Sequence, residues 1–351
     1  MTQADEYILD YGAIGLADRA CVGDKNALLG EARTQLGAAD IAVPAGFVVT
    51  AGAYRRFVHS NHLTAVIEHT LANLDIGRID VAEAGRTLRS AFLRAAMPEE
   101  LVRRIRVAYR ELVDRDGAAV VVRSSVASAE DLPVRFDGQH DAYLTVIGET
   151  ELLDACRRCY ASLFTDRAIR FRHSHGLDHA QIALAIGVQK MVRSDLACAG
   201  FARAVPADKG VGDQVSIQAC WGFAAPGGRH APDGDEYQVY CPDSATGGRI
   251  QSVRLGARMM KRVYCTVDAC VQEVPVTRAE AERPVLQDKE VLRLAAWAVA
   301  VERHFGSTME LEWAKDGHSG ALYLIQLQPV RGHRPSVDQP DVVERTVNFD
   351  G

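Results

Sequence analysis

The stretch TMELEWAKDGHSGALYLIQLQP runs from Thr308 to Pro329 and predicts two strands joined by a tight turn. The strands are expected over Thr308–Ala314 and Ala321–Gln328, with the turn-rich KDGHSG between them. Because side chains alternate between the two faces of a strand, one face of the first strand is apolar and the other is acidic. The apolar face carries Met309, Leu311 and Trp313, and the acidic face carries Glu310 and Glu312.

The second strand of this pair has a polar face of its own. Gln326 and Gln328 share one side, while Ile325 and Leu327 point to the other. If the strands pair, two carboxylates and two amides meet on one side of a sheet whose other side is core. That side is either a solvated polar face or a site for Mg²⁺, which usually binds one or two carboxylates and phosphate oxygens. No His or Cys joins the set, which argues against zinc.

The bulk composition is that of an ordinary soluble globular protein. The 351 residues are 48% hydrophobic and 25% charged, which suits two domains or one bilobed unit. A net charge of −6 gives no basic footprint for nucleic acid or an anionic membrane. The N-terminus lacks an apolar signal core, and the longest apolar run, Leu294–Val301, is too short to span a bilayer. We therefore expect a cytoplasmic protein without nucleic-acid or membrane partners.

Eight cysteines are scattered along the chain. Only Cys156 and Cys159 have C-x-x-C spacing, and no second pair lies at the distance of a zinc site. They fall in ELLDACRRCYASLF, which predicts a helix. Two reduced helix cysteines are the favoured interpretation, and a metal or redox site is the alternative.

Helical and strand patterns follow one another along the chain. Strands are expected at Val43–Thr50, 118–122 and 181–192, and helices over most of 51–115, over 150–172 and over 288–304, with a stop at Gly306. Two further strands are expected around a glycine-rich loop within 213–240. The tail from Gly332 is rich in Pro, Asp and Val and is typical of a linker or a frayed end.

Two cations stand where phosphate could bind. Lys25 lies in VGDKNALLG, at a glycine-containing loop that leads into a helix, where free backbone N–H groups favour an anion. Arg123 stands at the predicted exit of the buried strand 118–122. Each has an ordinary alternative: a solvated lysine for Lys25, and a structural ion pair rather than a phosphate clamp for Arg123.

Several stretches together resemble the N-terminal nucleotide-binding domain of phosphoenolpyruvate synthase and pyruvate phosphate dikinase. They are VGDKNALLGEA, VPAGFVVTAGAYRRF, RSSVASAEDLPVRFDGQHDAYLTV, CYASLFTDRAIRFR, GVQKMVRSD, GDEYQVYCP and MELEWAKDG with LYLIQLQP. They occur in family order over about residues 9 to 331. The resemblance implies an α+β, two-lobed ATP-grasp-like fold with mixed or antiparallel sheets flanked by helices. The expected divisions are an N-terminal lobe at 1–190, a C-terminal lobe at 191–332 and a tail or linker at 333–351.

The resemblance also implies ATP and Mg²⁺ as cofactors and a set of site residues. Lys25 and Arg123 would hold the ATP phosphates. Adenine would lie beside a strand segment formed by Gln189, Lys190, Met191 and Val192. Gly222 would open the glycine-rich loop, and Glu310, Glu312 and Gln326 would bind Mg²⁺ and the nucleotide.

Three positions depart from the family pattern. The catalytic arginine of the family, two residues after the matched Gln326, is Gln328 here, and Arg331 is a nearby candidate to replace it. The glycine-rich G-L-G-E loop reads Gly222–Phe223–Ala224–Ala225. Asp24 stands where a glycine is usual, and its charge would oppose phosphate unless the side chain turns away.

The reaction implied by the resemblance converts ATP to AMP and phosphate and passes a phosphoryl group through a phosphohistidine. The T-G-G…S-H motif of the phosphohistidine domain is not found, since Thr246–Gly247–Gly248 is followed by no histidine. A separate partner protein would then carry that histidine and the site for a small-molecule acceptor, as the resemblance to the ATP-binding subunit of phenylphosphate synthase suggests. A catalytically impaired nucleotide-binding subunit is the alternative, and an ATP-grasp ligase that makes ADP is a third. The histidines of RHSHGLDHAQ, His173, His175 and His179, are interpreted as a polar helix end rather than a metal site.

Overall fold

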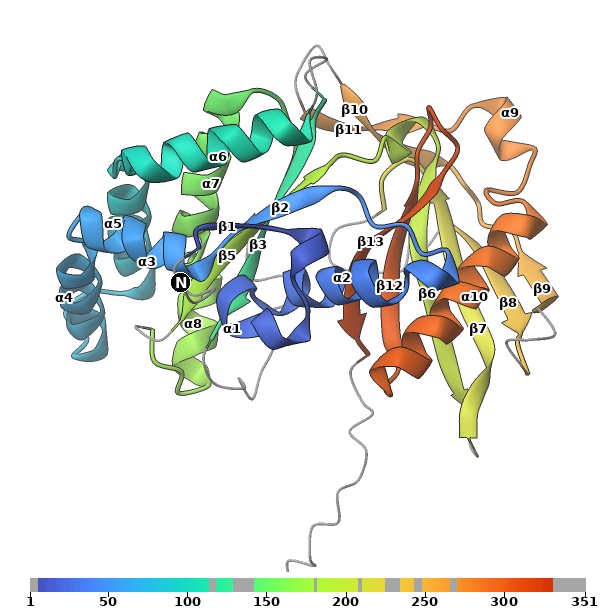
Figure 1. Cartoon of the computed structure of the whole chain (residues 1–351), viewed down its shortest axis with the longest axis horizontal. Coiled ribbons are helices and arrows are strands. Elements are labelled where there is room, and N and C mark those ends of the chain that lie inside the picture. Colours follow the sequence, from blue (N-terminus) through green and yellow to red (C-terminus); the bar gives the residue numbers. More distant parts are fainter. Residues whose placement is uncertain are drawn as a thin grey trace, which may run out of the picture.

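The computed structural model describes residues 6–113, 118–128, 142–179, 182–207, 210–224, 234–242, 248–265 and 270–330. Within these residues the chain forms two antiparallel sheets flanked by helices, so the predicted α+β class is confirmed (Figure 1). The first sheet has the strand order β1-β2-β5-β3-β4. Its strands are β1 (Ile8–Asp10), β2 (Gly46–Val49), β5 (Ala183–Lys190), β3 (Val120–Ala127) and β4 (Ala142–Val146).

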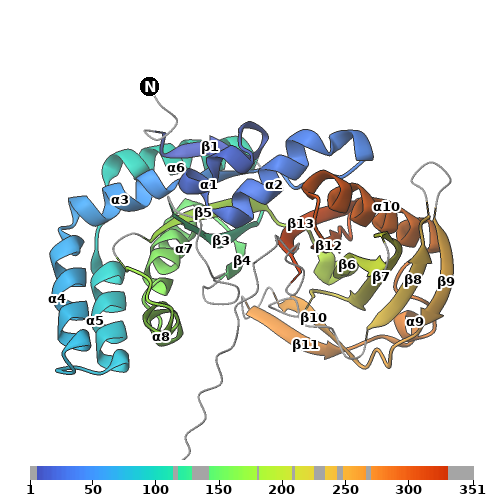
Figure 2. The same cartoon turned by 90° about the horizontal axis from the view of Figure 1, so that it is seen from below.

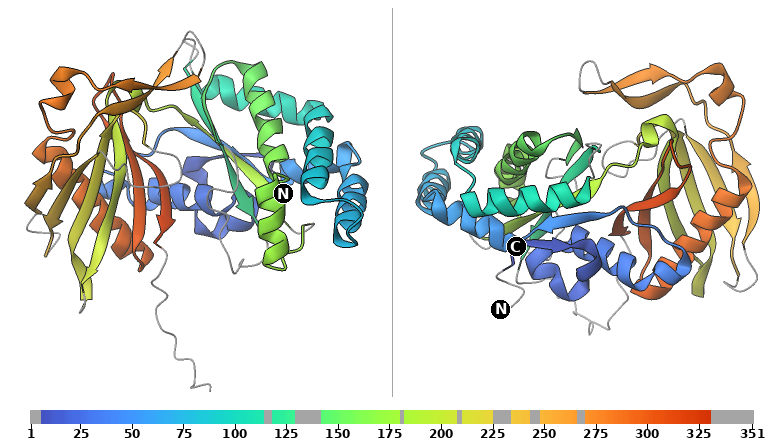
Figure 3. Two further views of the ribbon diagram at one scale, coloured as in Figure 1. Left: turned by 180° about the vertical axis from the view of Figure 1, so that it is seen from behind. Right: turned by 45° about the horizontal axis from the view of Figure 1, so that its top comes forward.

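Six helices lie on the side of the first sheet that faces away from the second sheet (Figure 3). They are α3 (Ala51–Ser60), α4 (Leu63–Asp75), α5 (Val81–Arg94), α6 (Glu99–Leu112), α7 (Glu149–Ser162) and α8 (Asp166–Ser174). Alternate residues of β5, among them Ile186 and Val188, join the apolar core beneath these helices, while Ala185 on the opposite face belongs to a second core. This two-sided cover explains why β5 reads as a continuous hydrophobic run.

The prediction of a single helix over 150–172 is wrong, because the structure has two helices, α7 and α8, with a break between them. Thr165 ends the break in an extended conformation, and its hydroxyl accepts a hydrogen bond from the amide of Ala168 at 3.2 Å. A threonine that caps a helix N-terminus in this way starts a new helix. The apolar spacing on the two sides of the break is similar, so periodicity alone did not reveal it.

Strand β3 is longer than the expected 118–122. It pairs with β5 from Val120↔Lys190 to Ala127↔Ala183, so Arg123 lies within the strand and not at its exit. Ser124 and Ser125, which follow Arg123 in the strand, are buried. The Ser125 hydroxyl accepts the backbone N–H of Lys25 at 3.1 Å, which gives one of these buried groups a partner from another element.

The second sheet has the order β13-β12-β6-β7-β8-β9. Its strands are β13 (Leu322–Pro329), β12 (Met309–Lys315), β6 (Cys198–Ala207), β7 (Gly210–Trp221), β8 (Asp235–Tyr240) and β9 (Arg249–Arg254). Helix α10 (Asp288–Phe305) covers one face and ends at Gly306, whose φ of 62° is the left-handed cap that the sequence predicted. The hairpin of β10 (Met260–Cys265) and β11 (Cys270–Pro275) extends on the other side of the sheet (Figure 2).

The pairing of β12 with β13 is confirmed, with one irregularity. Glu310 lies opposite Gln328 and Glu312 opposite Gln326, but the register shifts between Glu312 and Trp313. Trp313 pairs with Leu324, so Ile325 is an extra residue on β13. The expectation that Ile325 points away from the glutamines is therefore wrong, because a bulge interrupts the alternation.

The N-terminal segment links the two sheets. Helix α2 (Asp24–Gln35) packs against both β3 and β13 and contributes Leu28 and Leu29 to the core that contains α10 and the second sheet. Shorter helical elements complete the chain: 3-10 turns at Tyr11–Ala13, Leu16–Asp18, Gly37–Ala39 and Ser194–Leu196, with α1 (Arg19–Val22) and α9 (Arg278–Ala281). One apolar core thus runs from the N-terminal segment into the C-terminal half.

Cys156 and Cys159 are free thiols, as expected, and the other six cysteines are free thiols as well. Cys156 and Cys159 are fully buried on α7, and burial raises the pKa of the Cys156 thiol to about 12. A thiol with such a pKa stays protonated near neutral pH and is a poor nucleophile or metal ligand.

Among the helices that the structure describes, none combines the length and the apolar character that a membrane span requires.

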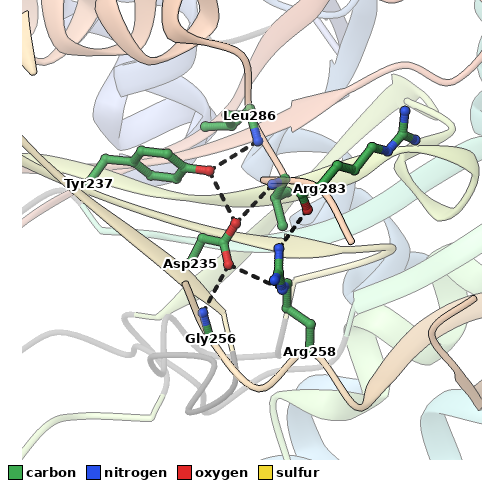
Figure 4. Close-up of polar contacts among 7 residues, drawn as sticks. Asp235, Tyr237, Gly256, Arg258, Arg283 and Leu286 are labelled. Carbon is green, nitrogen blue, oxygen red and sulfur yellow. Dashed lines mark hydrogen bonds and ion pairs between the residues drawn. The ribbon is translucent and has the colours of Figure 1, made fainter. Parts of the chain in front are cut away.

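A buried carboxylate ties the loops of the second sheet together (Figure 4). Asp235, at the start of β8, is fully buried and accepts hydrogen bonds from three donors. The donors are the amides of Val285 at 2.8 Å and Gly256 at 3.0 Å and the Tyr237 hydroxyl at 3.2 Å. The Arg258 guanidinium lies 3.6 Å from the same carboxylate and donates to the carbonyl of Arg283 at 2.5 Å. The cluster fixes the segments that precede β10 and α10.

Replacing this carboxylate should destabilise the chain strongly. Asp235→Ala is expected to lower the free energy of unfolding by about 3 kcal/mol, because it leaves the buried Val285 amide without its acceptor and the Arg258 guanidinium without its counter-charge. Urea denaturation measures the loss. The control is Glu282→Ala, which removes an exposed i,i+4 partner of Arg278 and should change the free energy by less than about 0.5 kcal/mol. Equal losses in the two variants would contradict the assignment of Asp235 as a structural hub.

Candidate functional site

A cavity opens where the two sheets meet. It has an empty volume of about 400 Å³, its open mouth included. Strands of both sheets line it, and Figure 2 shows β3 and β4 facing β12 and β13 across this region. The lining residues are Pro44, Val121, Arg123, Leu144, Gln189, Lys190, Met191, Val192, Ser194, Phe223, Ala314 and Ile325.

Arg123 crosses from the first sheet to the second. Its Nη1 donates a hydrogen bond to the carbonyl oxygen of Ile325 at 2.9 Å. Ile325 is the extra residue of the β13 bulge, so the irregular strand supplies the acceptor. A guanidinium carries five N–H groups in a planar fork, and Arg123 is among the residues that line the cavity.

Lys25 is brought to the same region by the start of α2. Gly23 precedes the helix with φ of +77°, and a Cβ there would collide with the side chain of Ser125 on β3. The close contact and the bond from the Lys25 amide to the Ser125 hydroxyl dock the N-terminus of α2 on β3, two residues beyond Arg123. Asp24 is exposed and lies 3.7 Å from Arg19, so its carboxylate has a cation of its own.

The electrostatic surroundings of Glu312 show that these cations and the acidic face are close together. Burial raises the pKa of its carboxyl, the charges of Arg123 and Lys25 act to lower it, and the neighbouring Glu310 raises it further. Lys25 and Arg123 belong to α2 and β3, whereas both glutamates belong to β12. The structure therefore gathers four of the predicted residues within electrostatic reach of one another.

Gln328 is held by its neighbours on the polar face. Its Nε2 donates to Oε1 of Glu310 at 2.7 Å, and its Oε1 lies 3.4 Å from Nε2 of Gln326. The position predicted for a family arginine thus holds an amide bonded to a carboxylate. Arg331, the other candidate for that charge, lies outside the described residues.

The donor set of the polar face fits a hard cation. Two carboxylates, Glu310 and Glu312, and the amide of Gln326 lie at neighbouring positions of β12 and β13, and the charge of Glu310 disfavours ionisation of Glu312. A divalent cation would relieve that repulsion. Within the described ranges, no three His, Cys, Asp or Glu side chains gather as a metal site. The set would therefore complete its coordination with phosphate oxygens and water, as Mg²⁺ commonly does.

The four predicted adenine-side residues line one wall of the cavity. Gln189 is buried and its side-chain amide donates to the carbonyl of Pro44 at 3.4 Å. The backbone amides of Lys190 and Met191 donate to Ala45 and Ala119 at 2.8 and 3.0 Å. The amide of Val192 donates to no backbone carbonyl of the described chain. It is thus available to a ligand at the end of β5.

Gly222 is fixed against β10. Its amide donates to Ala197 at 3.0 Å, and it forms a parallel bridge with Arg262. Its φ of +77° and the nearby Arg262 backbone leave no room for a Cβ. The next residue, Phe223, donates its amide to Arg262 at 2.9 Å and lines the cavity. Ala225 lies outside the described residues.

Sequence reasoning missed several lining residues. Ile325 was assigned to the opposite face because the bulge has no signature in the alternation. Phe223 stands next to Gly222, and an aromatic residue beside a glycine-rich loop was an available signal. Pro44 and Leu144 line the cavity only because the strand order of the first sheet brings their segments there. Both segments are distant in sequence from β5 and β13, so no local pattern pointed to them.

The histidine cluster lies at the end of α8, and none of its members lines the cavity. Nδ1 of His179 accepts a hydrogen bond from Nε of the buried Arg172 at 2.7 Å. Burial and the adjacent Arg172 lower the pKa of His179 to about 4, so its ring is neutral near pH 7. His173 and His175 are exposed.

Most of the chain is similar to known proteins. The family model described as pyruvate phosphate dikinase, AMP/ATP-binding domain, matches residues 19–346. The chain is 38% identical over 339 residues to a phosphoenolpyruvate synthase of Synechocystis sp., covering 92% of this chain and 41% of that protein. It is 38% identical to the phosphoenolpyruvate synthase of Pseudomonas aeruginosa, with 92% and 42% covered. A probable phosphoenolpyruvate synthase of Methanothermobacter thermautotrophicus is 32% identical, with 99% and 49% covered. The chain thus spans about two fifths to one half of the length of these relatives.

Removing the charge of Glu312 should stabilise the ligand-free chain at neutral and alkaline pH. Because the folded-state pKa is raised, the folded chain binds the Glu312 proton more tightly than the unfolded chain. This stability is complete below the ordinary pKa of 4.5 and is lost as the pH rises through the folded-state pKa. Glu312→Gln is expected to unfold at higher urea concentration than the wild type at pH 8, and the difference should shrink toward pH 4.5. Glu282→Gln, on the exposed surface, is the control and should give no such trend. A lower midpoint for Glu312→Gln at pH 8 would refute the expectation.

Proposed function

The chain belongs to the pyruvate phosphate dikinase, AMP/ATP-binding domain family, and on this premise we propose that it is the ATP-binding component of a dikinase-type phosphotransferase. In this proposal ATP lies between the two sheets. The observation that carries the proposal is the approach of Lys25 and Arg123 from one side to Glu312 from the other. Opposed cations and carboxylates are the arrangement that a magnesium-bound polyphosphate requires.

The phosphates would lie against Lys25, Arg123 and the N-terminus of α2. The 12-residue helix begins at Asp24, and its first turn presents N–H groups and the positive end of the helix dipole. The Arg123 guanidinium is held in place by its bond to Ile325 and keeps a planar fork suited to phosphate oxygens. Both cations would neutralise charge on the transferring groups without rearrangement, which is the main catalytic contribution in phosphoryl transfer.

The adenine ring would lie in the cavity beside the end of β5. The Val192 amide, which lacks a backbone acceptor in the described chain, would donate to a ring nitrogen. Met191, Phe223 and Ile325 supply apolar surface for the ring faces. A mostly apolar slot with a few fixed polar groups is the usual form of such a site.

Mg²⁺ would be held by Glu310, Glu312 and Gln326 on the polar face of β12 and β13. These residues would hold the ion, which would supply positive charge that neutralises the phosphates of ATP. Glu312 would be ionised in that state, since a nearby cation lowers the pKa of a carboxyl. The partly buried carboxylate would then be paired with a positive charge.

The reaction that we propose consumes ATP and water. The bond between the α–β bridging oxygen and the β-phosphorus breaks, and the β-phosphoryl group goes to a histidine nitrogen of a partner. The γ-phosphate leaves as inorganic phosphate when water cleaves its bond to the β-phosphate, and AMP departs. The partner histidine and a site for a small-molecule acceptor would lie on a separate protein or on a further part of the same polypeptide.

A catalytically impaired nucleotide-binding chain is the second candidate. It is favoured by Gln328, which places an amide bonded to Glu310 where the family has an arginine. It predicts nucleotide binding without turnover.

We propose that the chain divides into two lobes, at 1–190 and 191–332, with a tail at 333–351. The sheet topology supports this division, because β1–β5 form one sheet and β6–β9 with β12 and β13 form the other.

The released nucleotide distinguishes these functions. The chain is incubated with Mg²⁺ and ATP labelled in the α-phosphate, with and without a candidate partner protein that carries a phosphorylatable histidine. AMP and phosphate are the expected products. ADP would indicate an ATP-grasp ligase, and binding without any product would favour the impaired chain. Failure of the chain to bind ATP would refute the proposal.

The two cations should be essential for turnover. Lys25→Ala and Arg123→Ala are each expected to reduce AMP formation by at least about a hundredfold, because each removes a fixed charge from the transferring phosphates. Lys289→Ala is the matched control, since Lys289 also lies in the first turn of a helix but is exposed on α10. Thermal melting checks that the variants remain folded. Turnover close to the wild-type rate in both Lys25→Ala and Arg123→Ala would remove them from the site.

A further inference from the structure

Arg203 lies in the same cross-strand row as the candidate metal ligands. On β6 it pairs directly with Glu310 of β12, which in turn pairs with Gln328 of β13. Residues directly opposite in an antiparallel ladder project from the same face. Arg203 therefore shares the face of Glu310 and Gln328, away from α10.

The neighbours of Arg203 confirm this direction. Ala202 and Ala204 are each only 1% exposed, and Ala202 belongs to the apolar core that includes α10. Because side chains alternate along β6, Arg203 points to the opposite side of the sheet. It is partly buried there, on the side toward which the β10–β11 hairpin extends (Figure 2).

Within the described part of the chain, this guanidinium donates to no side chain or carbonyl. The carboxylate of Glu310, its neighbour on one side, accepts the amide of Gln328 at 2.7 Å. Ser216, its neighbour on β7, accepts the side-chain amide of Gln238 at 3.2 Å. By contrast, Arg254 on the edge strand of the same sheet pairs with Glu236 at 2.7 Å. A partly buried arginine among groups that are already bonded is suited to an anion from outside the chain.

The same row has an amide where the family has an arginine. Gln328 and Arg203 flank Glu310 from opposite sides, each one strand spacing of about 4.8 Å away. A phosphate held above Glu310 by a metal ion is therefore within range of a long side chain from either strand. Arg203 can deliver to that phosphate, from β6, the charge that Gln328 does not carry on β13.

We propose that Arg203 binds the outer phosphates of ATP and acts as the catalytic arginine of this chain. The inference rests on the proposed function, since it assumes that ATP and its metal ion occupy the face of Glu310 and Glu312. It assigns to Arg203 of β6 the positive charge that the family arginine would carry at the position of Gln328. It also explains why Gln328 can be neutral and bonded to Glu310 without leaving the phosphates unneutralised.

Calorimetry with two nucleotides tests Arg203 separately from the site. Arg203→Met is expected to weaken binding of ATP with Mg²⁺ by about tenfold to a hundredfold, the range for loss of a charge-assisted hydrogen bond. Its affinity for AMP should be unchanged, because AMP lacks the outer phosphates. Arg254→Met is the matched control on the same sheet and should bind both nucleotides as the wild type does. In the Arg203→Met background, Gln328→Arg should recover at least part of the ATP affinity and turnover.

Arg203→Lys guards against misfolding of the methionine variant. Lysine keeps a charge but loses the planar fork, so ATP binding should weaken several-fold with AMP binding intact. If the wild type, Arg203→Met and Arg203→Lys bind ATP equally and AMP equally, the role of Arg203 is refuted while the nucleotide site stands. Parallel loss of ATP and AMP binding in folded variants would also refute it, in favour of a structural role. If the wild type binds neither nucleotide, the proposed function fails and this inference fails with it.

Discussion

The contact between Arg123 and the carbonyl of Ile325 joins the two halves of the cavity. It requires that β3 and β13, which are about 200 residues apart in sequence, lie side by side. Helix α2 produces that arrangement, because it packs on both strands and its apolar face enters the core of the second sheet. The same helix carries Lys25 at its first turn. The packing of α2 into the core therefore also places the charged groups of the site.

The site concentrates charge that the unliganded fold does not favour. Burial and the proximity of Glu310 raise the pKa of Glu312, and the cations of α2 and β3 only partly oppose them. Natural sites commonly carry such local instability because the same groups are stabilised when ligand binds. Elsewhere in the second sheet the Asp235 carboxylate is well satisfied, since it accepts three hydrogen bonds near β10.

The two faces of the second sheet have different tasks. The face under α10 is apolar and holds Leu311 and Trp313 in the core. The opposite face carries the row of Gln328, Glu310 and Arg203 across three strands. A charge required at one point above this row can be supplied from either flanking strand. Substitution along a row of cross-strand neighbours can therefore preserve the electrostatics of a site while its linear motif changes.

The sequence by itself determined the strand pair at 309–329, the acidic face with Glu310 and Glu312, the Gly306 stop of α10 and the cation at the start of α2. These follow from local periodicity and from caps, which involve residues a few positions apart. Only the tertiary structure decided that β3 continues through Ser124 and Ser125, that 150–172 breaks at Thr165, and that a bulge turns Ile325 toward the cavity. It alone placed Arg203 beside Glu310. The reason is that cross-strand neighbours and the partners of buried polar groups come from distant segments, so alternation within one strand cannot specify them.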